Sequence, residues 1–255
     1  MSRPPRLPPG FRLIALERCG STNEEARRLA EDGAEEGTLV WAREQTAGRG
    51  RRGREWRSPR GNLYLSLVLR PRSTPAEAAC LGMVAAVALG DALGAFMPPL
   101  TEVRFKWPND VLVGGGKVGG ILLESGAQGP DRLAWVVLGI GVNIESCPQD
   151  TPFPATCLER EAGAKLELET VLEAVSRSLR RWLNIWREEG FGPAREAWLA
   201  RAWKKGEVIE VRLEGETLAG LFEGLDASGA LLLALEGGRH RCVSAGDVME
   251  ASVRR

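Results

Sequence analysis

LYLSLVL at residues 63–69, followed by TPAEAACLGMVAAVALG at residues 74–90, decides the kind of fold this chain adopts. Every second residue of the first run is leucine, and this period of two predicts a strand. In the second run Thr74, Pro75 and Glu77 match the start of a helix, and apolar residues then recur at helical spacing. The pair predicts a sheet strand followed by a long, apolar helix of the core.

Strand and helix patterns of the same kind are found on both sides of these two runs. Upstream, 11–16 reads as a short strand, and Ser21 to Glu24 matches the S-x-x-E capping box at the start of a helix. Downstream, a helix is expected over about 170–189, with apolar residues on one face and Gly190 at its end. Further strands are expected at 103–106, 118–124 and 135–144.

From Lys204 onward the pattern changes to short β-prone runs separated by Gly-containing turns. The runs are 208–213, 218–225, 230–235 and 239–244. They predict a small β-barrel domain of about fifty residues. The chain is therefore divided into a Pro-rich tail at 1–10, a larger domain at 11–203 and a barrel at 204–255.

Composition limits the class of protein. The 255 residues carry 34 basic and 34 acidic side chains, so net charge gives no general attraction to nucleic acid or anionic membranes. The five cysteines are scattered and include no CxxC pair, which favours reduced thiols over disulfides or zinc. The most apolar stretch, 81–97, contains Asp91 and ends at two prolines. We expect a cytoplasmic protein without a membrane segment.

EQTAGRGRRGREW at residues 44–56 is the most distinctive string. Gly48, Gly50 and Gly53 satisfy G-x-G-x-x-G, but a β run rather than a helix follows, so a dinucleotide-binding motif is excluded by context. Glycines let the backbone approach an anion, and arginines bind phosphate through forked hydrogen bonds. These residues alone fit a phosphate-binding loop and a solvated or RNA-binding basic loop about equally well.

Two further strings place charged groups at strand ends. FKWPND at 105–110 follows a strand with Lys106, Asn109 and Asp110, either as site residues or as a simple turn. GGGKVGGIL at 114–122 sets Lys117 on a Gly hairpin, either reaching a buried anion or exposed. It is not a Walker loop, because Val118 stands where Ser or Thr would bind magnesium.

LGIGVNI at 138–144 predicts a strand with glycine at every second position on one face. Either a ligand or a neighbouring strand must lie against that face. His240 is the one histidine of the chain and lies in the β domain, so no His-based triad or zinc cluster can be proposed.

Together these strings resemble the biotin protein ligase family. Ser21-Thr22-Asn23, QTAGRGRRGREW, KWPND, GKVGGIL and GIGVN occur in the family's order and spacing, over about residues 11–200. The resemblance implies an α/β (α+β) catalytic domain with a mixed sheet flanked by helices, of the class II aminoacyl-tRNA synthetase and biotin ligase type. It also implies that the tail domain is an SH3-like β-barrel.

The resemblance also assigns roles by position. Lys117, Asp110 and Arg51 are implied as catalytic residues. Biotin is expected to contact Ser21, Thr22, Asn23, Gln45, Arg49, Gly119, Gly120, Ile121 and Gly139. The adenylate and phosphates are expected to contact Arg49, Arg51, Arg52, Arg54, Trp56, Lys106, Asn109, Lys117 and Asn143. No metal ligand is assigned, and the segment 146–158 matches a loop over the adenine without individual assignments.

The implied reaction uses ATP with Mg²⁺, takes biotin as substrate and modifies a lysine of a biotin carboxyl carrier protein. A homodimer is expected from the resemblance. About twenty residues precede Ser21, too few for the DNA-binding domain of some relatives, so no DNA partner is expected. The alternatives are a lipoate or octanoyl ligase on the same fold and, in another class, a nucleic-acid-binding module.

Overall fold

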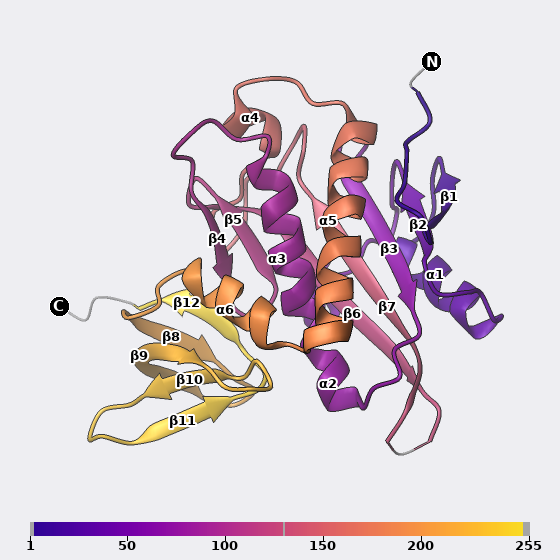
Figure 1. The fold of residues 1–255 in the computed structure, drawn as a ribbon. Coiled ribbons are helices and arrows are strands. Elements are labelled where there is room, and N and C mark those ends of the chain that lie inside the picture. Colours follow the sequence, from indigo (N-terminus) through magenta and orange to yellow (C-terminus); the bar gives the residue numbers. More distant parts are fainter. Residues whose placement is uncertain (1–2, 130, 252–255) are drawn as a thin grey trace.

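The computed structural model describes residues 3–129 and 131–251. Two sheets organise these residues (Figure 1). The larger sheet has seven strands in the order β1-β2-β3-β7-β6-β5-β4. Its first pair, β1 (Arg12–Leu16) and β2 (Thr38–Ala42), is parallel, and every other neighbouring pair is antiparallel, so the sheet is mixed.

The centre of the large sheet is its most apolar part. β3 (Leu63–Leu69) is buried along its whole length and pairs with β7 (Leu133–Val142), which pairs with β6 (Gly116–Ala127). β4 (Val103–Lys106) and β5 (Asp110–Val113) form a hairpin at one edge. The side chains of β3 alternate between the two faces, as period two requires.

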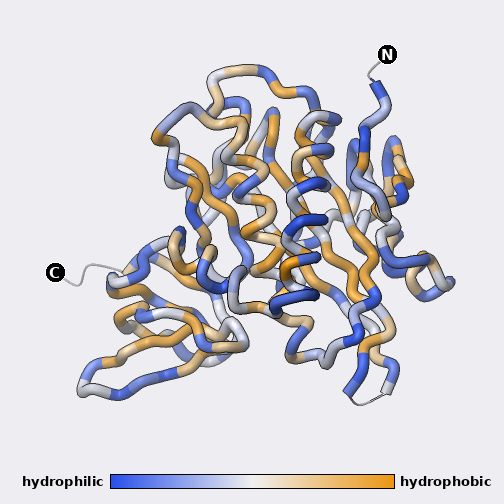
Figure 2. Tube along the Cα trace, in the orientation of Figure 1, coloured by the Kyte–Doolittle hydropathy of each residue, from blue (hydrophilic) through white to orange (hydrophobic). Residues whose placement is uncertain are grey.

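One face of the sheet is covered by α3 (Leu81–Gly94) and α5 (Leu168–Glu189), which lie side by side across it (Figure 1). Leu65, Leu67 and Leu69 point into this core with the apolar side of α3. Figure 2 shows how hydrophobic α3 and the central strands are. α2 and α3 together are long and apolar enough to cross a membrane, but they are largely buried here and form the core.

α1 (Thr22–Glu31) packs on the opposite face, where Ala26 and Ala30 contact Val40 and Val68 in a smaller apolar cluster. Alternation along β3 therefore turns Leu65 and Leu67 toward α3, but Ser66 toward α1, where it contacts Thr22 and Asn23. Thr22 and Asn23, two of the predicted functional residues, therefore lie on the α1 face of the sheet.

The smaller sheet is antiparallel, in the order β11-β10-β9-β8-β12. Its strands are β8 (Val208–Arg212), β9 (Thr217–Leu225), β10 (Leu231–Ala234), β11 (His240–Val243) and β12 (Asp247–Glu250). α6 (Gly192–Ala200) joins the two sheets: Trp198 is fully buried between Phe105 of β4 and Phe222 of β9. The division at 203/204 stays a prediction, and residues 1–2 and 252–255 of the expected end segments lie outside the described residues.

Several local expectations need correction. The helix expected from Thr74 is two helices, α2 (Pro75–Ala79) and α3, which meet at Cys80. The capping box at Thr74 is present, but Ser21 makes no side-chain cap hydrogen bond at the start of α1. Glu24, which that box would have used, instead forms ion pairs with Arg27 and Arg49. α4 (Leu158–Ala162), α6, β2, β5 and β12 were not expected from the sequence.

Candidate functional site

A cavity of about 430 Å³ opens on the α1 face of the large sheet and extends to the small sheet. Its wall combines the N-terminus of α1, the loop 45–57, the β4–β5 turn, β6, β7, the loop 148–155 and β12. Sixteen of the residues assigned a catalytic or binding role above line it: Ser21, Thr22, Asn23, Gln45, Arg49, Arg51, Arg54, Trp56, Lys106, Asn109, Asp110, Lys117, Gly120, Ile121, Gly139 and Asn143. The fold thus brings the separate strings into one place.

One end of the cavity is neutral and rich in hydrogen-bonding groups. Ser21 and Thr22 are almost fully buried at the start of α1. Gln45 Oε1 accepts hydrogen bonds from the Thr22 amide at 2.8 Å and from the Thr22 hydroxyl at 3.0 Å. Gln45 Nε2 donates to Ser58 Oγ at 2.8 Å, so the Gln45 amide is held in one orientation. Because Ser21 caps no helix amide, its hydroxyl remains available to a ligand.

The floor of the cavity is made by glycines. A Cβ at Gly139 would collide with the Asn23 amide, and one at Gly141 would lie 2.6 Å from the Trp56 ring. The side-chain-free face predicted for this strand is therefore covered by the side chains of Asn23 and Trp56, which line the cavity, and not by a neighbouring strand. Gly120 also faces Trp56.

Gly119 and Arg52 do not line the cavity. Gly119 faces Leu89 of α3 on the other side of the sheet, because neighbouring strand residues point to opposite faces. Arg52 takes a left-handed backbone conformation, with φ 54°, inside the single 3₁₀ turn Arg51–Gly53 and points to Asp247. Gly119 is thus not among the residues that line the cavity, and its contact with biotin stays a prediction; Arg52 reaches the site through its ion pair with Asp247.

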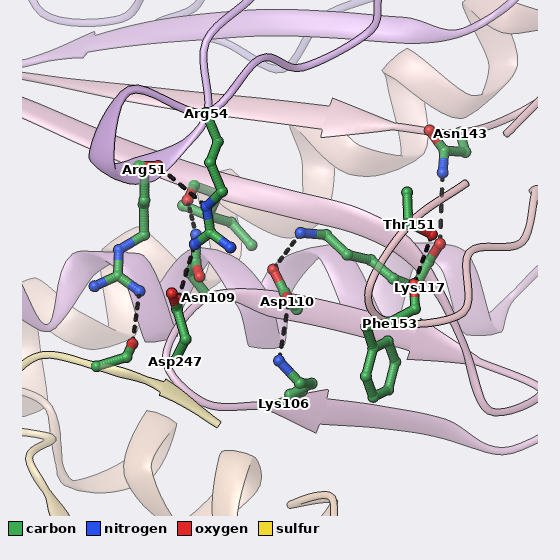
Figure 3. A network of polar contacts seen from close by, with 12 residues as sticks. Arg51, Arg54, Lys106, Asn109, Asp110, Lys117, Asn143, Thr151, Phe153 and Asp247 are labelled. Carbon is green, nitrogen blue, oxygen red and sulfur yellow. Dashed lines mark hydrogen bonds and ion pairs between the residues drawn. The ribbon is translucent and has the colours of Figure 1, made fainter. Parts of the chain in front are cut away.

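The other end of the cavity is charged (Figure 3). The β4–β5 hairpin sets Lys106 opposite Asp110, and the Asp110 carboxylate also meets Lys117 of β6. The Lys117 ammonium lies 2.6 Å and the Lys106 ammonium 3.6 Å from the carboxylate. Burial lowers the pKa of Lys106, although the Asp110 charge opposes that shift. One largely buried carboxylate is therefore shared by two ammonium groups.

Aromatic rings cover both lysines. The Lys117 ammonium lies 5.2 Å from the Trp56 ring centre, and the Lys106 ammonium 4.9 Å from that of Phe153. Phe153 belongs to the loop 148–155. This loop runs beside Lys117, whose backbone amide donates to the Pro154 carbonyl at 2.8 Å. Asn143 Nδ2 donates to the Thr156 carbonyl at 3.1 Å and so holds the base of this loop.

The arginine loop is fastened to the small sheet. Arg54 Nη2 lies 2.8 Å from Asp247 Oδ1, and Arg52 Nη1 lies 3.6 Å from Asp247 Oδ2. Arg51 Nη1 donates to the Gly246 carbonyl at 3.4 Å. Figure 3 shows Arg51, Arg54 and Asp247 side by side near Asn109. The start of β12 thus holds the arginines at the mouth of the cavity.

Sequence reasoning missed several residues that line the cavity. They are Gly141 of β7, Thr151 and Phe153 of the loop 148–155, and Asp247 and Met249 of β12. The GIGVN pattern carried a signal for Gly141. Asp247 and Met249 had none, because their place depends on how the small sheet docks and not on local sequence. Asn109 was expected at the adenylate, and its Nδ2 donates to the Ile121 carbonyl at 2.5 Å.

Comparison with known proteins adds independent findings. Residues 55–200 match the model of the Biotin/lipoate A/B protein ligase family, and residues 206–249 match the Biotin protein ligase C terminal domain. A biotin–[acetyl-CoA-carboxylase] ligase of Paracoccus denitrificans is 46% identical over 229 residues, covering 88% of this chain and 95% of that protein. The bifunctional ligase/repressor BirA of Bacillus subtilis is 36% identical, covering 92% of this chain and 73% of its own length.

Solved structures resemble the fold as a whole. The biotin protein ligase of Aquifex aeolicus in complex with biotin and ATP has a TM-score of 0.78 and 29% identity, covering 93% of this chain and 97% of that one. The biotin protein ligase of Leishmania major in complex with biotinyl-5-AMP has a TM-score of 0.67 and 26% identity, covering 93% and 100%. Both resemblances include the catalytic and the C-terminal parts.

Proposed function

The chain belongs to the biotin protein ligase family, and from that premise we propose how its cavity carries out the family's two steps. The chain is an ATP-dependent biotin–[biotin carboxyl carrier protein] ligase. In the first step the biotin carboxylate attacks the α-phosphorus of ATP, giving biotinyl-AMP and pyrophosphate. In the second an acceptor lysine attacks the biotinyl carbonyl, and AMP leaves.

The observation that carries this proposal is the two-part character of the cavity. A neutral end with Ser21, Thr22 and Gln45 meets the donors and acceptor of a cyclic urea. A cationic end with Lys117 and Arg54 suits a carboxylate joined to a phosphate. Biotinyl-AMP combines a neutral ring and an anionic linkage at opposite ends of an apolar chain, and the cavity matches that order.

Lys117 serves the first step. Negative charge develops where the biotin carboxylate meets the α-phosphate, and a fixed ammonium stabilises it most where water is excluded. Lys117 is bound to Asp110 at 2.6 Å in the free enzyme, and the anionic substrates compete with that carboxylate for it. Asn109 and Asn143, whose amides are bound to Ile121 and Thr156, form the walls rather than a flexible clamp.

Asp110 serves the second step. The acceptor amine must lose a proton to attack the mixed anhydride, and a carboxylate in reach of the linkage can take it. Asp110 is nearly buried, and Lys106 remains beside it when Lys117 turns to the substrate. Lys106 thereby keeps the carboxylate from becoming an unpaired buried charge.

The arginine loop retains the intermediate. Arg49, Arg51 and Arg54 line the cavity, whereas Arg52 acts by pairing with Asp247. Trp56 lies against the glycine floor, where it can cover the mixed anhydride. Retention of biotinyl-AMP until an acceptor arrives is therefore assigned to this loop.

Magnesium is expected with ATP, but the described residues of the cavity provide no set of side-chain ligands for it. Residues 3–129 and 131–251 include no group of three or more His, Cys, Asp or Glu side chains placed to hold a metal ion. Mg²⁺ typically keeps several waters and binds through substrate phosphates. We therefore treat it as part of the MgATP substrate and assign no step to a protein-bound metal.

The acceptor is proposed to be the lysine of a biotin carboxyl carrier protein or domain, in keeping with the name of the Paracoccus relative. The cytoplasmic location and the homodimer stay predictions. Repression of a gene, which the Bacillus name includes, is not proposed for this chain.

Biotin-dependent exchange of labelled pyrophosphate into ATP tests the function directly. We expect exchange with biotin and none with lipoate or octanoate. Exchange with lipoate and not biotin would replace this function with that of a lipoate ligase. A calorimetric titration of biotin and then MgATP adds the binding order, and we expect each ligand to tighten the other. Nucleic-acid binding that ignores biotin and falls with salt would favour the nucleic-acid module instead.

A further inference from the structure

Two cysteine thiols meet at the base of the loop 148–155, whose residues line the cavity. Cys147 comes immediately before this loop, and Cys157 lies two positions beyond it. Cys147 Sγ donates to the Ala155 carbonyl at 3.7 Å, and the side chains of Cys147 and Cys157 also form a hydrogen bond with each other. Cys157 is 4% exposed, and Cys147 is partly exposed. The function proposed above uses neither thiol.

Backbone hydrogen bonds hold the two ends of this segment together. Asn62, which is 2% exposed, accepts at its Oδ1 from the three successive backbone amides of residues 144–146. On the other side of the loop, the Leu158 amide at the start of α4 donates to the Asn143 carbonyl at 2.9 Å. The chain between these points is a closed loop of the Ω type, and its base brings the two thiols side by side.

The loop between the thiols contacts both lysines of the cavity. The Phe153 ring centre lies 4.9 Å from the Lys106 ammonium. The Lys117 amide donates to the Pro154 carbonyl at 2.8 Å, and the Thr156 amide donates to the Lys117 carbonyl at 3.0 Å. The loop therefore lies over the charged end of the cavity, and its movement controls access to the place proposed for the phosphates.

We propose that Cys147 and Cys157 are a modification site, at which a hydroperoxide forms a disulfide that holds the loop 148–155 over the cavity and slows the entry of MgATP. The thiol pair stands on its own contacts, whereas the effect on MgATP rests on the proposed function.

The oxidation takes two balanced steps. The Cys147 sulfur attacks one oxygen of the hydroperoxide and the O–O bond breaks, which gives a sulfenic acid, while the thiol proton leaves with the departing oxygen as water or an alcohol. The Cys157 sulfur then attacks the Cys147 sulfur, the S–S bond forms, and the Cys157 proton leaves with the hydroxide as water. The thiols lose two electrons and two protons in all, and the hydroperoxide is reduced.

The surroundings of the two thiols assign the order of these steps. Burial raises the pKa of the Cys157 thiol, although a hydrogen bond with the Arg160 backbone opposes that shift. A buried, protonated thiol reacts slowly with an oxidant in solution. Cys147 is the more exposed of the pair, so it meets the hydroperoxide first and Cys157 resolves the sulfenic acid.

The first test locates the disulfide. Full-length enzyme is treated with hydrogen peroxide and digested with trypsin without reductant. No lysine or arginine lies between Cys147 and Cys157, so both stay in one peptide, and a disulfide lowers its mass by that of two hydrogen atoms. We expect this loss in wild type, its reversal by dithiothreitol, and its absence in Cys147→Ser and Cys157→Ser. Cys242→Ser, at an exposed thiol of the small sheet, is the matched control and should show the same loss as wild type.

The second test measures the effect on MgATP. Biotin-dependent pyrophosphate exchange is followed against MgATP concentration before and after peroxide. We expect kcat/KM for MgATP to fall about tenfold or more in wild type and in Cys242→Ser, and to recover with dithiothreitol. Neither Cys147 nor Cys157 lines the cavity, so the two serine variants should match untreated wild type and should not respond to peroxide.

Three results separate the outcomes. A peptide whose mass stays unchanged, or rises by bound oxygen, overturns the proposal. A disulfide that leaves kcat/KM for MgATP unchanged also overturns it and leaves the ligase function standing. Reduced wild type that shows no exchange overturns the function itself, and the peptide mass still tests the thiol pair. If Cys157→Ser does not fold, Cys147→Ser decides.

Discussion

At the scale of single residues, Lys117 and Asp110 divide the chemistry between them. Lys117→Ala removes a point charge from the place where an anion develops, and the side chain contributes little packing because it is partly exposed. We expect biotin-dependent pyrophosphate exchange to fall about 100- to 1,000-fold, the usual cost of one lost electrostatic contact to a transition state. Lys165→Ala, an exposed lysine outside the cavity, should match wild type. Exchange within a few-fold of wild type in Lys117→Ala would remove Lys117 from this role.

Asp110→Asn separates the two half-reactions. An amide cannot take the acceptor proton, so transfer from preformed biotinyl-AMP should slow more than adenylate formation does. The substitution also leaves the buried Lys106 ammonium without its ion-pair partner, which we expect to lower the free energy of unfolding by about 3–5 kcal/mol. Single-turnover transfer, pyrophosphate exchange and urea denaturation measure the three quantities. A similar loss in both half-reactions would contradict the assigned base.

At the scale of elements, β12 holds the arginine loop over the cavity. Asp247→Asn removes the ion-pair partner of Arg52 and Arg54, and exposed pairs of this kind contribute about 0.2–1 kcal/mol each. We expect a few-fold more biotin on an unrelated lysine-rich protein incubated with the enzyme, biotin and ATP. Glu250→Gln lies on the same strand but pairs with Lys204, and it should behave as wild type.

The Arg51→Gly enzyme should release more biotinyl-AMP than the Asp247→Asn enzyme does. A charge-assisted contact to the adenylate contributes roughly 1.5–3 kcal/mol, and its loss raises escape by about 10- to 100-fold. The biotin found on the unrelated lysine-rich protein, divided by the amount of adenylate formed, measures this release. Labelling at the wild-type level while adenylate still forms would shift retention to Arg49 or Arg54.

The elements also show what sequence can and cannot predict. The local sequence was enough to predict β3 from its alternating leucines and to predict the bounds of β4. It also predicted the change to short strands after Lys204. β2 was not, because a strand buried on both faces shows no alternation. The motifs named about half of the residues that line the cavity, whereas Asp247 reaches it only because the small sheet docks there.

At the scale of the whole molecule, Trp198 ties the two sheets into one unit. Its ring is fully buried, 6.1 Å from Phe105 of the large sheet and 6.4 Å from Phe222 of the small one. We expect Trp198→Ala to lower the free energy of unfolding by about 3–5 kcal/mol in a single transition followed by circular dichroism in urea. Leu100→Ala, at a side chain that is 99% exposed, should change nothing. Two separate transitions in wild type would show that the sheets unfold independently.

The place of Trp56 also makes the enzyme its own optical reporter. Its indole lies on the glycine floor beside the Lys117 ammonium, and its Nε1 is buried with no hydrogen-bond partner among the described residues. The emission of an indole depends on nearby charge and on hydrogen bonding at that nitrogen, and a substrate changes both when it draws Lys117 away. The chain has eight tryptophans, so the difference between wild-type and Trp56→Phe spectra isolates this one. Stopped-flow fluorescence would then follow substrate entry and adenylate loss in real time, with no label attached.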